Sequence, residues 1–242
     1  VVVPAQGATI VVSDGGDAGT GSTCTLRQAI ASLNGGVVVD GCLNTGAGFG
    51  SGDNVDLSGR TGTIALAGAA PLPINVSMSI QGPGPAALTL SGGGASQVFR
   101  VAGSANEFDL SGVTVANGKS KGPGGCIYAQ APSGVFLSNA VITGCSATDD
   151  PNLGPIPFNG IGGGVFAYAL FADGTTISGN TAKAAGGGVA VECGVTGARS
   201  TSRDRRSRAC ARRLRAGRRR ARSSACAESR ALVCPNWCRR MH

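Results

Sequence analysis

The segment TTISGNTAKAAGGGVAV, residues 175–191, contains one charged side chain and four glycines. Its composition is typical of a flexible linker, because Gly, Ala, Ser and Thr form mobile coil. The same order of residues recurs upstream, however: an apolar residue, small polar residues, a glycine pair and a second apolar run. It occurs at residues 113–129 and again at residues 140–168. A pattern that recurs in this way indicates a structural repeat rather than a linker.

Each repeat is predicted to contain two short strands joined by a tight turn. The opening apolar residues are Val115, Ile142 and Ile177, and the middle repeat is longer because residues 148–160 are inserted in it. One repeat cannot bury its apolar residues alone, so neighbouring repeats must stack and share a core. Strands stacked in parallel about 4.8 Å apart would place the three apolar residues in one inward-facing column.

The glycines suit the corners of such a stack, where the backbone needs a positive φ and passes close to other backbone. Asn117 and Asn180 can hold corners through hydrogen bonds from their side chains to the backbone. Upstream, short apolar or alternating runs closed by glycine continue the pattern less regularly. We therefore predict that residues 8–193 form an all-β parallel β-helix, a solenoid. A sandwich or barrel is the competing all-β arrangement, and the recurring glycine pairs favour the solenoid.

Composition divides the chain into two parts. Glycine supplies 41 of the 242 residues, against an average share of about 7%. Residues 1–198 carry six basic side chains against eleven carboxylates, a net charge of −5, whereas residues 199–242 carry fifteen arginines against two carboxylates, a net charge of +13. The two parts must therefore be interpreted separately. No run of 18 or more apolar residues occurs, so we expect no transmembrane segment.

The first seven residues, VVVPAQG, have two interpretations. They match the remnant of a signal peptide, with an apolar run before small residues at a cleavage site. They also match an ordinary first strand. Export would suit the five cysteines that precede residue 199, because disulfides form in oxidising compartments.

A solenoid has an open end whose unpaired strand edge invites aggregation, so a cap is expected. Thr25 and Gln28 have the spacing of a capping box, and apolar residues follow at helical spacing. These are Leu26, Ala29, Ile30 and Leu33. We predict an amphipathic capping helix near residues 25–34. Cys24 and Cys42 bracket it, and a disulfide between them would fasten the cap to the first strands.

The segment TCTLRQAIASLN at residues 23–34, followed by DGC at residues 40–42, resembles the bacterial CSLREA motif. The residues that match it are Cys24, Leu26, Arg27, Ala29 and Ile30. Gln28 stands where the family usually has Glu, and the capping role tolerates that change. The glycine repeats and the FLSN segment at residues 136–139 are similar to the GGA, GGI and FxxN repeats of polymorphic outer-membrane proteins and autotransporter passengers.

This resemblance covers residues 8–193 and implies a right-handed parallel β-helix with a pectin-lyase-like fold. It implies a bacterial protein that is secreted or held at the cell surface or outer membrane, where most relatives have no assigned chemistry. We therefore predict a non-catalytic scaffold, similar to an adhesin or passenger, that binds carbohydrate or a cell-surface protein. The insertion at residues 148–160 is the expected contact loop, because loops on a rigid solenoid provide specificity.

An enzyme is the alternative function, because the same fold occurs in polysaccharide lyases and glycoside hydrolases. A hydrolase needs paired carboxylates, and Asp149 and Asp150 are adjacent in the insertion. A lyase would need Ca²⁺, the one cofactor considered, held by carboxylates beside a base such as Arg100. Such isolated charges are more often solvated, so we expect no catalytic, cofactor or metal site. The same interpretation applies to Glu107, Asp109, Lys119, Lys121, Asp173, Lys183 and Glu192.

Two groups of uncharged residues keep alternative interpretations. Tyr128, Phe166 and Tyr168 flank glycine corners. They are expected to pack in the core or stack on one another, with a carbohydrate-contacting strip as the alternative. Cys126 and Cys145 occupy equivalent positions of neighbouring repeats, where a disulfide and stacked free thiols are both open.

The tail at residues 194–242 breaks the pattern and is rich in Arg and Cys. It could be a basic arm for nucleic acid or another anionic surface, or a metal or disulfide module. The cysteines of such a module would be Cys210, Cys226, Cys234 and Cys238. We favour a translated frameshift, because GGC glycine codons become GCG (Ala) or CGG (Arg) when they are read out of frame. The tail is then expected to be disordered, and no nucleic acid partner is expected unless the tail is genuine. Reading the gene in its other two frames beyond the Cys193 codon tests this, and a stop-free glycine-rich continuation is the expected result.

Overall fold

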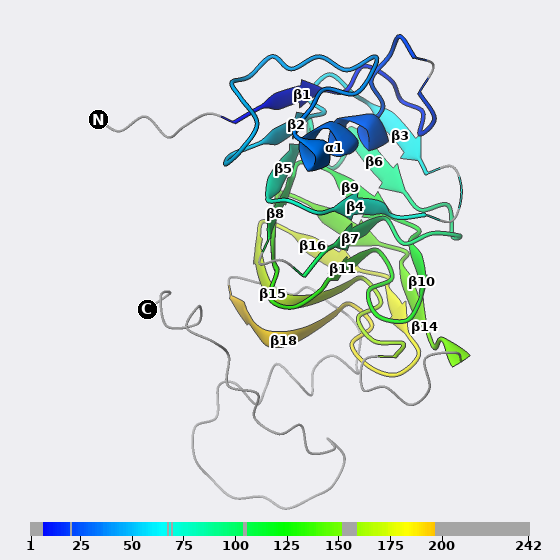
Figure 1. Cartoon of the computed structure of the whole chain (residues 1–242). Coiled ribbons are helices and arrows are strands. Elements are labelled where there is room, and N and C mark those ends of the chain that lie inside the picture. The colour runs from blue at the N-terminus through cyan, green and yellow to red at the C-terminus, as the bar shows by residue number, and fades with distance from the viewer. Residues whose placement is uncertain are drawn as a thin grey trace, which may run out of the picture.

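The computed structural model describes residues 7–19, 21–66, 68, 70–103, 106–151 and 159–196, the last four by their backbone alone. These residues form one helix and eighteen short strands (Figure 1). The helix is α1 (Leu26–Gly35). The strands are β1 (Thr9–Val11), β2 (Asn54–Asp56), β3 (Gly62–Ala65), β4 (Leu72–Ile74), β5 (Met78–Gln81), β6 (Leu88–Ser91), β7 (Phe99–Val101), β8 (Glu107–Ser111), β9 (Thr114–Ala116), β10 (Lys119–Lys121), β11 (Ile127–Ala129), β12 (Gly134–Ser138), β13 (Val141–Thr143), β14 (Ser146–Thr148), β15 (Val165–Asp173), β16 (Thr176–Ser178), β17 (Thr181–Ala182) and β18 (Val189–Thr196).

All the strand pairings among these strands are parallel. A ten-stranded sheet runs in the order β1-β2-β5-β8-β12-β15-β11-β7-β4, with β18 beside β15. A five-stranded sheet runs β16-β13-β9-β6-β3, and a three-stranded sheet runs β10-β14-β17. The sheets curl around one apolar core, and very little of the described chain is helical (Figure 1). The prediction of an all-β protein with parallel strands is confirmed, and the arrangement is consistent with a solenoid.

The predicted apolar column is confirmed by the strand register. Val115 on β9 pairs with Ile142 on β13, which pairs in turn with Ile177 on β16. The side chains of Val115 and Ile142 are 0% exposed, whereas Ile177 is only partly buried against the core. Stacking at constant register therefore turns the sequence repeat into a continuous core.

The corners between strands use residues that tolerate a left-handed backbone. Asn117 and Asn139 have φ angles of 54° and 45°, and Gly144 and Gly174, at the equivalent positions of the next repeat, have 66° and 54°. Glycine and, less easily, asparagine adopt this conformation at low cost. The abundance of glycine is thus explained by corners that recur in each repeat.

Asn180 closes one corner from the inside. Its Oδ1 accepts a hydrogen bond from the Cys145 N–H at 2.9 Å, and its Nδ2 donates to the Ile142 carbonyl oxygen at 3.0 Å. The Asn180 side chain is buried, so these bonds satisfy polar groups that water does not reach. The predicted role of Asn180 is confirmed. Asn117 contributes the left-handed backbone conformation of its own corner.

The helix α1 covers one end of the core (Figure 1). Oγ1 of Thr25 accepts from the Gln28 N–H at 3.2 Å, and Oε1 of Gln28 accepts from the Thr25 N–H at 3.0 Å. The helix packs against β1, β2 and β4, and its residues Leu26, Ala29 and Ile30 are fully buried. The apolar stripe of the helix therefore takes the place that a further layer of strands would otherwise occupy.

Two further links fasten α1 to its surroundings. Arg27 donates to the two carboxylate oxygens of Asp17 through Nε and Nη2, each at 2.9 Å. Cys24, two residues before the helix, forms a disulfide with Cys42, and their Cα atoms are 4.4 Å apart. The disulfide closes a loop that contains the whole helix, so it limits how far α1 can move from the first strands.

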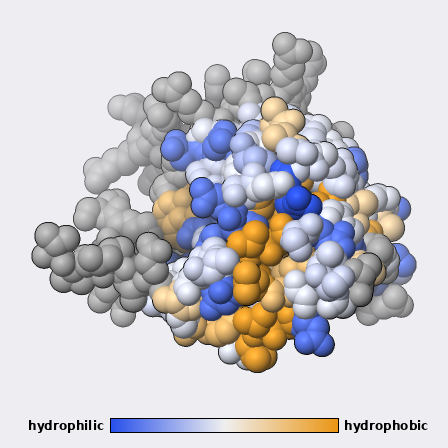
Figure 2. All heavy atoms as spheres, turned by 90° about the horizontal axis from the view of Figure 1, so that it is seen from above, coloured by the Kyte–Doolittle hydropathy of each residue, from blue (hydrophilic) through white to orange (hydrophobic). Residues whose placement is uncertain are grey.

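The outer edge of β1 is covered by the loop that follows the disulfide. Oδ1 of Asn44 accepts from the Thr9 N–H at 2.9 Å, and the Thr45 N–H donates to the Thr9 carbonyl oxygen at 2.9 Å. The Ala47 N–H donates to the carbonyl oxygen of Gly7 at 3.1 Å. The loop thus pairs backbone groups that an edge strand would otherwise expose. Figure 2 views this end of the molecule and shows an apolar patch among polar residues. The large apolar residues exposed in the described chain are Val37, Val38 and Leu43.

A second disulfide joins neighbouring repeats inside the core. Cys126 and Cys145 are bonded, with Cα atoms 5.5 Å apart, and both side chains are buried. Gly118 makes room for them, because a Cβ at this position would lie 2.6 Å from the Cys126 sulfur. Of the two arrangements that the sequence left open, the structure has the disulfide.

Several sequence-based expectations lie outside the described residues. They concern the signal-peptide interpretation of residues 1–6, most of the expected contact loop at residues 152–158, and the Arg- and Cys-rich segment from residue 197 onward. The side chain of Cys193 also lies outside them. Among the described residues, no helix is long and apolar enough to cross a membrane.

Candidate functional site

One outward-facing row on the ten-stranded sheet combines a cation with two aromatic rings. Arg100 on β7, Tyr128 on β11 and Phe166 on β15 are paired in register. The guanidinium carbon of Arg100 lies 5.3 Å from the centre of the Tyr128 ring. The Tyr128 and Phe166 rings stack with centres 5.6 Å apart and planes 27° apart. Burial raises the pKa of Tyr128, and the positive charge of Arg100 opposes this shift.

A second outward row runs beside it on the same sheet. Asp109 on β8, Phe136 on β12 and Phe171 on β15 are paired in register. The Phe136 and Phe171 rings stack with centres 4.7 Å apart and an angle of 7°. In both rows the rings face one another along the stack. The faces that a sugar ring would need are therefore largely taken, which favours the stacking role over the carbohydrate-contacting strip.

Asp109 is a carboxyl group on this face whose environment disfavours its charged form. Burial by the surrounding sheet raises the pKa of Asp109, and the nearby negative charge of Glu107 raises it further. The side chain still reaches solvent, so the shift reflects partial rather than full loss of hydration. A carboxyl group with a raised pKa is a candidate general acid.

The residues considered for catalysis are not assembled into one site. Asp149 forms an ion pair with Lys183 at 3.2 Å, and both side chains are exposed. The Asp150 N–H donates to Oδ1 of Asn159 at 2.7 Å, and Nδ2 of Asn159 donates back to the Asp150 carbonyl oxygen at 3.0 Å. These bonds clamp the two ends of the insertion. Arg100 lies on the ten-stranded sheet over Tyr128 instead.

Within the described ranges, His, Cys, Asp and Glu side chains do not gather in groups of three that could hold a metal ion. The calcium site of the lyase alternative is therefore not assembled from these residues.

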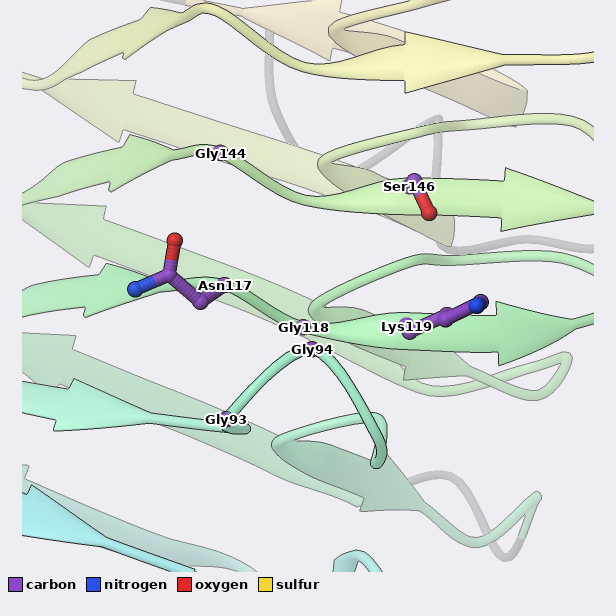
Figure 3. A pocket seen from close by; sticks show the side chains of 7 residues that line it. All are labelled: Gly93, Gly94, Asn117, Gly118, Lys119, Gly144 and Ser146. Carbon is purple, nitrogen blue, oxygen red and sulfur yellow. The ribbon is translucent and has the colours of Figure 1, made fainter.

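A hollow of about 430 Å³ lies where the five-stranded sheet meets the three-stranded sheet (Figure 3). It is lined by Gly93, Gly94, Asn117, Gly118, Lys119, Gly144 and Ser146. Four of these residues have no side chain, so the corner is thin and the surface is hollowed there. On the N-terminal side, residues 92–96 turn back on themselves, because the N–H groups of Ala95 and Ser96 donate to the Gly92 carbonyl oxygen. The next two repeats place β10 and β14 here instead.

Lysines gather on the three-stranded sheet beside this hollow. Lys119 pairs with Ser146, which pairs in turn with Thr181, and Lys121 pairs with Thr148. Lys183 follows β17, and its N–H donates to the Ala147 carbonyl oxygen at 3.0 Å, so it continues the register beside Thr148. We name this outward surface the lysine face. It comprises Lys119, Lys121, Ser146, Thr148, Thr181 and Lys183, and it carries all three lysines of the chain.

From the sequence alone, these lysines are predicted to be separate surface charges, and the lysine face is not identified. The repeat spacing in the sequence would have identified this surface. The six residues of the lysine face are those found four and six positions after Val115, Ile142 and Ile177. Extending the predicted column by four residues would have brought them together.

Comparison of the chain with protein-family models, with curated proteins and with solved structures found no match.

Proposed function

We propose that the chain is a right-handed parallel β-helix protein of the CSLREA type, secreted by a bacterium or held at its surface, that serves as a non-catalytic binding scaffold. The motif resemblance at residues 23–34 supports the family. The parallel ladders, the helix over one end of the core and the two disulfides are what such a protein requires. Disulfides also suit a protein that works outside the cell.

The observation that carries the non-catalytic part of the proposal is the dispersal of the charged groups. Asp149 is engaged by Lys183 on the three-stranded side, and Arg100 lies against an aromatic ring on the ten-stranded sheet. General acid–base catalysis needs such groups within reach of one reacting atom. The sheets instead offer long, regular outer faces, which is what solenoid proteins use for binding.

A polysaccharide lyase or glycoside hydrolase is the second candidate, and Asp109 is the observation that favours it. Its pKa is raised and it lies beside Glu107 on an outer sheet face. Glycoside hydrolases use a pair of carboxyl groups, and the one that acts as general acid has a raised pKa.

Incubation of the full chain with polygalacturonate and neutral glucans, with and without Ca²⁺, separates the two functions. The expected result is that no new reducing ends and no unsaturated products form. Turnover that is abolished in Asp109→Asn or Arg100→Gln, but retained in Asp173→Asn, would replace the scaffold with an enzyme. Asp173 is the matched control because it is also on the ten-stranded sheet, at the end of β15.

A further inference from the structure

We propose that the lysine face and the adjoining hollow bind an acidic polysaccharide, a sugar chain that carries carboxylate groups. This inference rests on the proposed scaffold function and names the class of ligand. It is carried by three features of the described residues: the position of the lysines, the hydroxyl side chains beside them, and the hollow beside Lys119.

The three lysines lie together, although the part of the chain that contains them has a negative net charge. Residues 1–198 have a net charge of −5, yet Lys119, Lys121 and Lys183 all lie on one small sheet. Lys119 and Lys121 are exposed on β10. They are two residues apart on one strand, so their side chains leave the sheet about 6.6 Å apart. Among the described residues, only Lys183 of the three forms an ion pair, with Asp149.

Hydroxyl groups occupy the other positions of the lysine face. Ser146, Thr148 and Thr181 occupy the neighbouring strands on the same outward side. Oγ1 of Thr148 donates to the Ser120 carbonyl oxygen at 3.0 Å, which links β14 to β10 at this point. A ligand with many hydroxyl groups finds donors and acceptors here in addition to the two ammonium groups.

The hollow gives the face a place for a group that a flat sheet could not hold. Figure 3 shows Lys119 and Ser146 on adjacent strands, with Asn117 at the corner and the glycine-rich turn of Gly93 and Gly94 beside them. A volume of about 430 Å³ is in the range of small-molecule sites, about 300–1,000 Å³. One sugar unit can therefore sit in the hollow while its neighbours extend along β10 past Lys121.

The same positive charges would also attract a nucleic acid. The residue composition of the lysine face, however, does not favour a nucleic acid as the ligand. Single-stranded nucleic acid is bound through aromatic side chains on which the bases stack. The strands β10, β14 and β17 contain no aromatic residue. The stacked aromatic pairs of the described chain lie on the ten-stranded sheet.

The arginine-rich segment after residue 198 would bind any polyanion, so a direct binding assay alone does not locate the site. The sequence supplies a readout that ignores that segment, because it contains no lysine. Amine-reactive labelling of the full chain, followed by peptide mass mapping, therefore reports on the lysine face alone, with the N-terminal amine as internal reference. Oligogalacturonate is the acidic probe, and a neutral glucan of equal length is the control.

The expected result is that oligogalacturonate slows the labelling of Lys119 and Lys121 several-fold more than that of the N-terminal amine, while the neutral glucan changes neither rate. Lys119→Gln should lower the protection of Lys121, whereas the matched charge change Arg100→Gln on the other sheet should leave it unchanged.

Two outcomes would overturn the inference. Labelling of both lysines that is unaffected by oligogalacturonate would remove the site. Equal protection by a single-stranded oligonucleotide of the same charge would show a site selective for charge alone, and not for polysaccharide. Neither outcome depends on the turnover assay above, so the ligand class and the scaffold function fail separately.

Discussion

The two ends of the described stack of parallel strands differ in how their last layer is covered. At the N-terminal end, α1 buries Leu26 and Ile30 completely, and hydrogen bonds from the loop after Cys42 cover the edge of β1. At the other end, β16, β17 and β18 are the last strands of their ladders in the described residues. The core residues there, Ile177 and Val189 among them, are only partly buried.

The difference shows what a solenoid layer needs in order to be stable. Each layer gains most of its burial from the layers on its two sides. The N-terminal layer has a helix, a disulfide and a loop in place of the missing neighbour. Within the described residues, the last layer has a neighbour on one side only. The same apolar residue type should therefore contribute very different amounts to stability in the two settings.

The largest expected effect tests this directly within one column. Ile142→Ala removes a side chain that is 0% exposed, so the free energy of unfolding should fall by about 2–5 kcal/mol. Ile177→Ala removes the next residue of the same column, which is only partly buried, and it should cost less than half as much. Chemical denaturation of both variants under identical conditions provides the measurement. Equal losses would mean that the last layer is as well covered as the interior.

The second effect compares the two disulfides. They close loops of nearly equal length, with sequence separations of 18 and 19 residues. Chain entropy alone therefore predicts a loss of about 3 kcal/mol for either pair. We expect Cys24→Ser/Cys42→Ser to lose about this amount, and to lower Tm by roughly 6–12 °C.

Cys126→Ser/Cys145→Ser should be more destabilising than the variant at the cap. Both of its sulfur atoms are in the core, so two hydroxyl groups would be buried where the disulfide was. Thermal unfolding followed by circular dichroism ranks the two variants. If the cap variant is the less stable of the two, the cap governs the stability of the whole domain and the interpretation of the core disulfide is wrong.

Much of the fold followed from spacing in the sequence. Val115, Ile142 and Ile177 could be aligned because each precedes small polar residues and glycines, and the structure pairs them as predicted. The position of the helix could be predicted because a capping box and an apolar stripe are local features. The structure has it at Leu26–Gly35, one residue later than expected.

The outer faces were harder to predict, because burial does not restrict them to one residue type. The column of Phe136 and Phe171 was not anticipated, although both rings occupy equivalent positions. In the repeat that contains Phe136, β11 and β12 are separate strands, whereas the next repeat, which contains Phe171, replaces both with the single strand β15. Because the break between β11 and β12 is absent from the next repeat, the residues that pair in the structure are difficult to align from the sequence.

The smallest expected effect is a difference in how stability depends on pH at the two ends. One carboxyl group at each end is compared. Asp14, near the cap, accepts hydrogen bonds from Thr23 Oγ1 at 2.6 Å and from the Gly16 N–H at 2.8 Å. The bond from Thr23, then that from Gly16, holds the pKa of Asp14 below its usual value of 3.8, and the charge of Arg60 adds to this. On β18, burial alone raises the pKa of Glu192 above its usual value of 4.5.

The two shifts have opposite consequences for stability. The folded state binds a proton at Asp14 less readily than the unfolded state does, so Asp14 stabilises the fold above its unfolded pKa, and this is lost as the pH falls through its folded pKa. The folded state binds a proton at Glu192 more readily, so stability is lost as the pH rises through the window above 4.5. A carboxylate that accepts hydrogen bonds therefore supports the capped end, and one whose charged form is disfavoured by burial weakens the other end.

Asp14→Asn should accordingly lower Tm at about pH 7, and its difference from the parent chain should vanish once the pH is below the pKa of Asp14 in the fold. Glu192→Gln should raise Tm slightly at about pH 7, by no more than about 0.5 kcal/mol in stability, and have no effect below about pH 4. Tm measured over this pH range for both variants is the test. A Glu192→Gln variant that is less stable than the parent at neutral pH would show that the carboxylate has a partner in solution, and the last layer would then be covered after all.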